Sequence, residues 1–222
     1  MGDCFDDTDD SDKFGPTDTL IRVRFTADAG IYNVVDFKDW SAVWYDILRG
    51  FAVATGNAPE EFRFVGASSG SVVAMFAADP VNVAAVVLAV ERGLAITNQV
   101  LDLKLKATEI KQSPLDSKAI QDAIAKGISQ ALNNGPEQVA AEIETQFSLE
   151  GNDGEQKNAL RHGIGKMFEF FDKGGEVDFV VPKKLESEPT EEDFKIAFER
   201  LDKIREGVES IRSEERKKQL LI

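Results

Sequence analysis

Few residues in this sequence are of the types from which most catalytic and metal sites are built. Its 222 residues include one histidine, His162, and one cysteine, Cys4. A single cysteine cannot form an intrachain disulfide, which fits a reducing compartment. One histidine and one cysteine so far apart cannot supply a nitrogen–sulfur metal site, and no carboxylate stands at a metal-motif spacing from His162. We therefore expect neither a metal nor a cofactor.

Positive charge is also scarce, because 26 Lys and Arg stand against 40 Asp and Glu, for a net charge of −14. Phosphate backbones and anionic membranes repel such a chain on average, so we expect no general nucleic-acid binding. Long hydrophobic runs are missing as well: the most apolar segment, residues 81–90, is far shorter than the ~20 residues of a spanning helix. The N-terminus is acidic and lacks the pattern of a secretory signal. We expect a cytoplasmic chain without a transmembrane segment.

The periodicity of the apolar residues predicts an α+β fold. Residues 19–26 alternate between apolar and polar side chains, as a half-buried strand does, and residues 36–56 repeat apolar side chains at helical spacing behind Asp36 as the cap. Two short apolar runs then flank a glycine- and serine-rich turn at residues 66–71. With the long helix that follows, we interpret residues 18–112 as a βαββα unit, half of a ferredoxin-like sandwich.

The long helix begins at Asp79-Pro80 and ends near residue 111. An aspartate accepts hydrogen bonds from the free amides of the first turn, and proline at the first position has no amide proton to satisfy. Such a helix is roughly 48 Å long at ~1.5 Å per residue, which is longer than a sheet of three short strands, so its far half must pack on something else. Its apolar seam has near-heptad, coiled-coil spacing. The seam consists of Val83, Val87, Val90, Leu94, Leu101 and Leu105.

Residues 113–189 are predicted to be mainly helical. We expect a helix over residues 115–132, a new helix starting at Pro136, and a third helix over residues 159–171. Residues 176–182 alternate as a strand. This strand is expected to return to the sheet, because a lone strand leaves its backbone groups unpaired.

The two ends of the chain have contrasting compositions. Residues 1–17 contain six aspartates and little to bury, which is typical of a disordered acidic tail. Residues 190–222 predict a long amphipathic helix. Its apolar stripe consists of Phe194, Phe198, Leu201, Ile204, Val208 and Ile211. We predict that this stripe and the seam of the long central helix form protein interfaces, because their apolar length exceeds what one small sheet can cover.

The turn Gly66-Ala67-Ser68-Ser69-Gly70 reads as G-x-S-x-G. It resembles the nucleophile elbow of the patatin-like lipases, in which a strand enters the turn and a helix leaves it. The resemblance implies a serine hydrolase with Ser68 as the nucleophile and Asp153 or His162 as its partner. However, the β-branched run after the turn favours a second strand and hence a plain hairpin, and no glycine-rich oxyanion loop precedes Ser68.

Three arginines fall on the polar faces of predicted strands, namely Arg22, Arg24 and Arg63. If the first two strands are neighbours, the arginines form a small basic patch that could take an anion or a nucleotide. The aromatic residues that a nucleic-acid-binding sheet needs beside its basic residues alternate to the opposite face. Pairing with nearby acidic side chains is therefore the favoured interpretation.

Residues 19–112 also resemble a loosely defined group of uncharacterised prokaryotic proteins in which a glycine–serine hairpin runs into a long helix. Members of that group often lie near effector or conflict systems, which implies a bacterial, antiphage-defence setting. Our leading hypothesis is a non-enzymatic interaction or assembly protein that contacts a second copy or an effector protein through its long amphipathic helices. The alternatives are the serine hydrolase and an anion- or nucleotide-sensing module.

Overall fold

A computed structural model describes residues 19–68, 72–78, 80–111, 118–147 and 154–180 of the chain. These residues form an α+β fold, as expected, and the fold contains four strands and four α-helices. The predicted acidic tail and the predicted C-terminal helix over residues 190–222 lie outside the described residues, as does the proposed cap Asp79.

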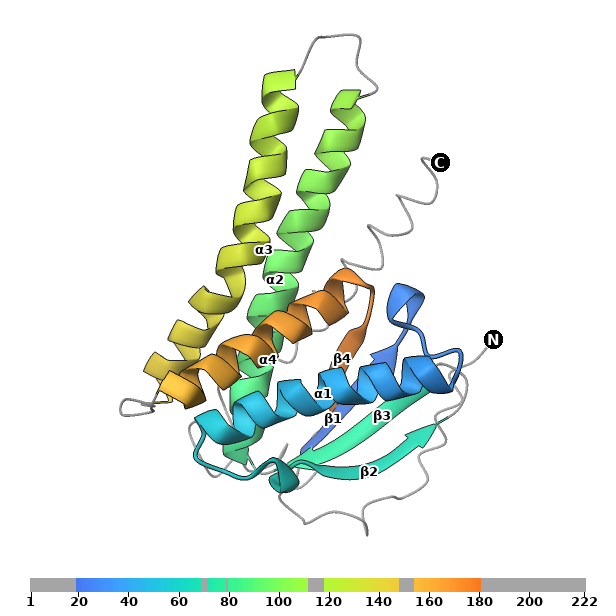
Figure 1. Cartoon of the computed structure of the whole chain (residues 1–222), viewed down its shortest axis with the longest axis vertical. Helices are drawn as coiled ribbons and strands as arrows, with labels where there is room; N and C mark the ends of the chain where they lie inside the picture. The colour runs from blue at the N-terminus through green and yellow to red at the C-terminus, as the bar shows by residue number, and fades with distance from the viewer. Residues whose placement is uncertain (1–18, 69–71, 79, 112–117, 148–153, 181–222) are drawn as a thin grey trace.

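The sheet contains β1 (Thr19–Phe25), β2 (Arg63–Ser68), β3 (Val72–Ala78) and β4 (Glu176–Val180). Its order is β2-β3-β1-β4, and every neighbouring pair is antiparallel. β4 therefore does return to the sheet, where it pairs with β1 along the edge opposite β2 (Figure 1). The apolar positions of β1 face the core, because Ile21, Val23 and Phe25 are buried while the intervening arginines are only half-buried.

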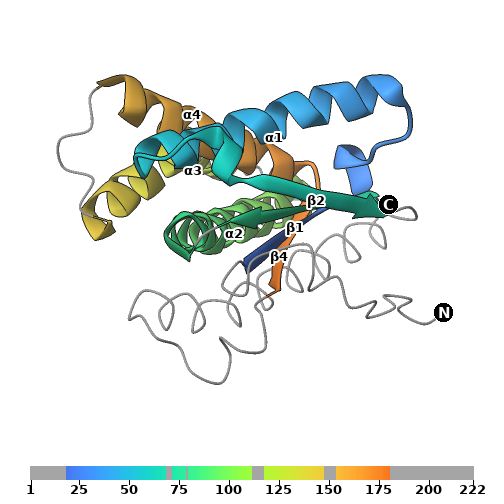
Figure 2. The same cartoon turned by 90° about the horizontal axis from the view of Figure 1, so that it is seen from below.

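Two helices cover one face of this sheet, α1 (Val34–Ala54) and α4 (Gly154–Asp172), which lie side by side (Figures 1 and 2). Strand order and connections together give the βαββαβ topology of a ferredoxin-like sandwich, with β3 between β1 and β2 and β1 between β3 and β4. The stretch 18–112 thus supplies three strands and one helix of the sandwich. The second helix of the sandwich is α4, not the long helix that follows β3 and was predicted to have this place.

The sandwich core is rich in aromatic side chains. Phe170 of α4 lies edge-on to Phe25 of β1 and to both tryptophans of α1, Trp40 and Trp44, with ring centroids 5.2–5.5 Å apart. Edge-to-face pairs of this kind add to the free energy of area burial. Both tryptophans belong to the apolar repeat predicted over residues 36–56 and are buried, but Phe37 in the same repeat is 52% exposed.

The start of α1 differs from the prediction. Asn33, not Asp36, is the N-cap, and its side-chain oxygen accepts hydrogen bonds from the amides of Val35 and Asp36. The carboxylate of Asp36 reaches back to accept from the amide of Tyr32 at 3.0 Å and from the side chain of Asn33 at 2.8 Å. Asn33 therefore satisfies two free amides of the first turn, while Asp36 holds the cap residue and the residue before it.

A helical hairpin is inserted between β3 and α4. It consists of α2 (Pro80–Lys111) and α3 (Lys118–Gln146), which pack along each other and project far beyond the sandwich (Figure 1). The far half of α2 thus packs on α3. The helix was expected to need a further packing surface because it is longer than the sheet, and α3 is that surface. We call this pair of helices the arm.

The predicted break before Pro136 is wrong, because α3 continues through it. Proline inside a helix removes one backbone hydrogen bond. Tertiary packing opposes that loss: Gly135 is buried, and a Cβ there would lie 2.7 Å from the ring of Phe168 and 3.1 Å from Ile96. Close contact with α2 and α4 therefore keeps α3 helical where the local sequence favours an end.

Candidate functional site

The G-x-S-x-G turn joins two paired strands. β2 ends at Ser68 and β3 begins at Val72, and Ser68 pairs with Val73 across the antiparallel ladder. A nucleophile elbow requires a helix after the turn. The strand that follows removes this support for the hydrolase alternative and agrees with the hairpin interpretation.

Neither Asp153 nor His162, the proposed partners of Ser68, adds support for a hydrolase site. Asp153 lies outside the described residues. His162 is on α4, where its side chain is 60% exposed and its Nε2 is 3.6 Å from Oδ2 of Asp46 on α1. The histidine therefore lies against a carboxylate of the neighbouring helix.

The three arginines do not form one patch, because β3 separates Arg63 from β1. Arg22 lies opposite Asp178 in the β1–β4 ladder and forms a salt bridge with it. Arg24 lies opposite Glu176, at 3.8 Å. Cross-strand partners thus neutralise both β1 arginines, as the charge-pairing interpretation expects, and the proposed anion site loses two of its three members.

Most of the predicted seam of α2 is not available to a partner. Four of its residues, Val83, Val87, Val90 and Leu94, are buried in the chain's own core. The reason is that the first half of α2 is apolar on all sides and is surrounded by other parts of the molecule, as a core helix is. Leu101 and Leu105, further along, are only partly buried. The other predicted interface residues, on the 190–222 segment, lie outside the described residues.

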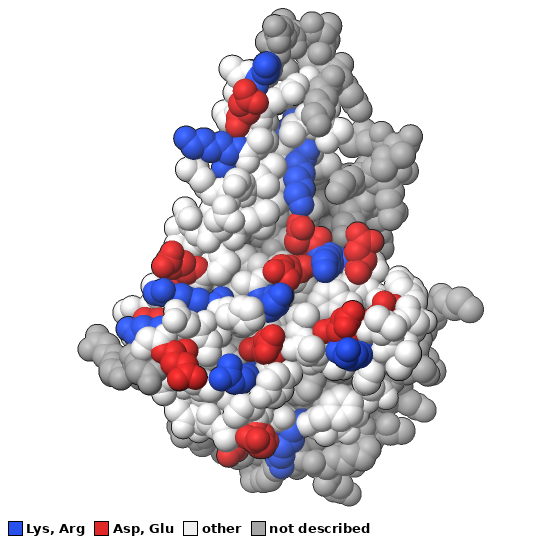
Figure 3. Space-filling view, in the orientation of Figure 1, with Lys and Arg blue, Asp and Glu red and all other residues white. Residues whose placement is uncertain are grey.

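The far part of the arm is covered much less well. We call residues 101–111 of α2 and 118–134 of α3 the distal arm. No described side chain of the distal arm is buried, although it carries eight large aliphatic residues, and Ile120 is 54% exposed. These residues are Leu101, Leu103, Leu105, Ile110, Ile120, Ile124, Ile128 and Leu132. In Figure 3 the arm shows broad uncharged areas between side chains of both signs.

One salt bridge joins the two helices of the arm, and another joins the arm to the sandwich. Arg92 of α2 donates to both carboxylate oxygens of Glu142 on α3, at 2.6–3.1 Å. This hydrogen bonding raises the pKa of Arg92 above its ordinary value, against the lowering effect of burial. Lys104 of α2 lies 2.7 Å from Asp172, at the end of α4. The arm is therefore anchored at its base and is held beside α4 further out.

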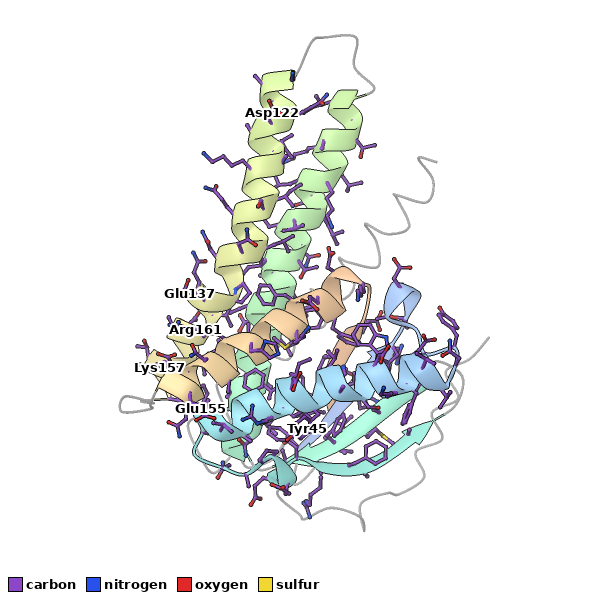
Figure 4. All side chains as sticks on the ribbon, in the orientation of Figure 1. Tyr45, Asp122, Glu137, Glu155, Lys157 and Arg161 are labelled. Carbon is purple, nitrogen blue, oxygen red and sulfur yellow. The ribbon has the colours of Figure 1, made fainter. Side chains whose placement is uncertain are left out.

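A hollow of about 330 Å³ lies between α1 and the β2–β3 hairpin, and we call it the α1–β2 groove. Its wall is formed by α1 and its floor by β2 and β3. Aromatic side chains dominate the lining, and Figure 4 shows Tyr45 on the side of α1 that faces these strands. Phe37, Tyr45 and Phe64, all of which line the groove, are 52%, 58% and 61% exposed.

Sequence reasoning missed the α1–β2 groove. It assigned the apolar residues of α1 to one core stripe, whereas Phe37 and Tyr45 lie on a second stripe, eight residues apart. It also took Phe64 to share the buried face of its strand. Phe64 does face the helices, where it packs edge-on to Phe76 at 5.7 Å, but β2 is an edge strand that α1 does not cover fully. The second apolar stripe on α1 was the feature of the sequence that could have predicted the groove.

Two further properties bear on the class of the protein. Among the described residues, no three His, Cys, Asp or Glu side chains gather as a metal site would require. The stretch Asn82–Ile110 is long and apolar enough to cross a membrane by those two criteria, but 67% of its apolar window is buried inside the molecule.

No protein-family model matches this chain, and neither does any curated protein or solved structure.

Proposed function

We propose that this chain is a non-enzymatic assembly protein that contacts its protein partner through the distal arm. The observation that carries the proposal is the loss of burial along the arm: residues 82–90 of α2 are all buried, and no described side chain of the distal arm is. A helix buries its apolar stripe against another element in a stable architecture. Two helices alone leave the outer sides of both stripes open.

A second copy of the chain is the simplest partner. Two antiparallel helical hairpins can pack as a four-helix bundle, which buries the apolar sides of both. A twofold contact of this kind brings identical surfaces together, so the surface must be complementary to itself. The distal arm allows such complementarity, because it carries charges of both signs, such as Asp122 and Lys126 four residues apart on α3.

An effector protein is the other partner that the sequence predicts. A bacterial antiphage-defence or conflict system is the setting that the prokaryotic resemblance implies. No observation on the described residues favours a hydrolase at Ser68 or an anion sensor at Arg22, Arg24 and Arg63.

The proposal is tested by the substitution Ile120→Glu. Ile120 is already 54% exposed and lies in the first turn of α3, where an acidic side chain suits the helix dipole, so the monomer should fold normally. The matched control is Val34→Glu, which places the same charge on a 79% exposed residue in the first turn of α1. Light scattering across a concentration series should give at least twice the 24.4 kDa chain mass for the native chain and the control.

In the Ile120→Glu variant we expect the mass to fall to that of one chain, because the contact would bury an unpaired carboxylate. A native chain that is monomeric at every concentration overturns self-association. The effector alternative is then tested by photo-crosslinking from position 120 in cell extract, with position 34 as the control.

A further inference from the structure

The α1–β2 groove has an apolar floor and a wall with regularly spaced polar groups. Ala74 and Phe76 of β3 and Phe64 of β2 belong to the floor. Along the wall, Ser41, Tyr45 and Arg49 recur every four residues on α1, which places them on one side of the helix. Among the described residues that line the groove, Arg49 alone carries a formal charge.

The wall residues differ in how far their polar groups are already used. The Ser41 hydroxyl donates to the carbonyl oxygen of Phe37 at 2.6 Å, within α1. In the described part of the chain, neither the Arg49 guanidinium nor the Tyr45 hydroxyl has a hydrogen-bond or ion-pair partner. Arg49 is also only half-buried, so it can meet an anion at the mouth of the groove without a large desolvation cost.

The size of the groove limits its occupant. Its volume of about 330 Å³ falls at the lower end of the ~300–1,000 Å³ range of small-molecule sites, which are mostly apolar with a few placed polar groups. A helix with its side chains is ~10–12 Å across and cannot enter such a space. A single extended hydrocarbon chain can.

We propose that the α1–β2 groove binds a single-tailed amphiphile, with the tail on the aromatic floor and an anionic head on Arg49. A medium-chain fatty carboxylate has this chemistry, with one apolar chain and one negative charge. The carboxylate accepts charge-assisted hydrogen bonds from the planar guanidinium, and the Tyr45 hydroxyl lies one helical turn away as a second donor. The site is separate from the distal arm and does not depend on the proposed assembly function.

Binding is tested by calorimetric titration of the full chain with decanoate, decanol and decyltrimethylammonium, all below the concentration at which micelles form. Decanoate should bind more tightly than decanol by about tenfold or more, since a hydrogen bond to a charged group adds about one power of ten or more in affinity. Decyltrimethylammonium should bind most weakly, because Arg49 repels it. In a series of carboxylates from hexanoate upward, each added methylene should tighten binding about fourfold until the tail outgrows the groove.

Two variants separate the head-group contact from the tail contact. Arg49→Met keeps the apolar stem and removes the charge, so decanoate affinity should fall about tenfold while decanol affinity changes less than twofold. Ala67→Phe fills the groove from β2 and should abolish binding of both. The matched control is Lys38→Met, which removes an exposed cation of the same helix that does not line the groove, and it should bind decanoate normally.

Circular dichroism of each variant checks that the fold is retained. The proposal is overturned if the native chain does not bind decanoate. It is equally overturned if decanol binds as tightly as decanoate, or if Arg49→Met and Lys38→Met weaken decanoate binding alike.

Discussion

Two glycines set how closely the sandwich helices approach each other. A Cβ on Gly50 of α1 would lie 2.6 Å from the carbonyl oxygen of Ala159, and a Cβ on Gly163 of α4 would lie 3.1 Å from that of Ile47. Backbone atoms cannot move aside as a side-chain tip can. The contact between α1 and α4, which places His162 beside Asp46, therefore depends on the missing side chains.

This contact predicts opposite effects of the same substitution at two helical glycines. Gly50→Ala should lower the free energy of unfolding by about 1–3 kcal/mol, because the methyl group forces α1 and α4 apart. Gly165→Ala should raise it by about 0.5–1 kcal/mol, since a Cβ there meets nothing within 4 Å and alanine favours the helix. Urea denaturation followed by circular dichroism measures both. Equal effects of the two substitutions would mean that Gly50 does not set the helix spacing.

At the scale of the elements, α3 shows packing overriding a local stop signal. Asn134, Gly135 and Pro136 together predict the end of a helix, yet the helix runs from Lys118 to Gln146. Gly135 is needed for the contact with Phe168, whereas Pro136 lies inside the helix and removes one of its backbone hydrogen bonds. The two neighbouring residues thus have different roles in the same element.

Pro136→Ala should therefore stabilise the chain by about 1–3 kcal/mol, because it restores a backbone hydrogen bond and removes the clash with the preceding turn. Gly135→Ala should destabilise it by about 1 kcal/mol or more, since Phe168 is buried and has little room to move. Thermal unfolding of the two variants beside the native chain gives the comparison. A lower melting temperature for Pro136→Ala would show that the proline shapes the arm in a way the chain needs.

At the scale of the whole molecule, burial is distributed unevenly. The sandwich and the base of the arm share one core that includes Trp44, Phe170 and Val90. Within the described part of the chain, the helices of the distal arm pack on each other, and Lys104 also contacts Asp172. Stability should follow the same gradient, because parts with few buried apolar contacts open locally at low free energy.

Hydrogen exchange should resolve this gradient. In the Ile120→Glu variant, amides of the distal arm should exchange at least ten times faster than those of β1 and the first half of α2, because a single arm is poorly covered. In the native chain at high concentration, assembly should slow exchange in the distal arm and leave β1 unchanged. Distal-arm amides as well protected as those of β1 in the variant would contradict both the gradient and the role of Ile120.

The elements whose signals are local follow from the order of the amino acids alone. Alternation predicts β1 and β4, the two apolar runs around a glycine-rich turn predict β2 and β3, and Pro80 marks the first residue of α2. The need to pair the backbone groups of a late strand also predicted that β4 rejoins the sheet. For the elements themselves neighbouring residues carry the physical cause, whereas the return of β4 follows from the general need to pair its backbone groups.

Which elements lie together becomes clear from the three-dimensional arrangement. The placement of β3 between β1 and β2 separates Arg63 from Arg22, and α4 rather than α2 becomes the second sandwich helix. These outcomes depend on contacts between residues far apart in the chain. Local periodicity contains no information on such contacts. The same holds for the α1–β2 groove, because its floor and its wall come from separate elements, and whether an apolar side chain is buried depends on what lies above it.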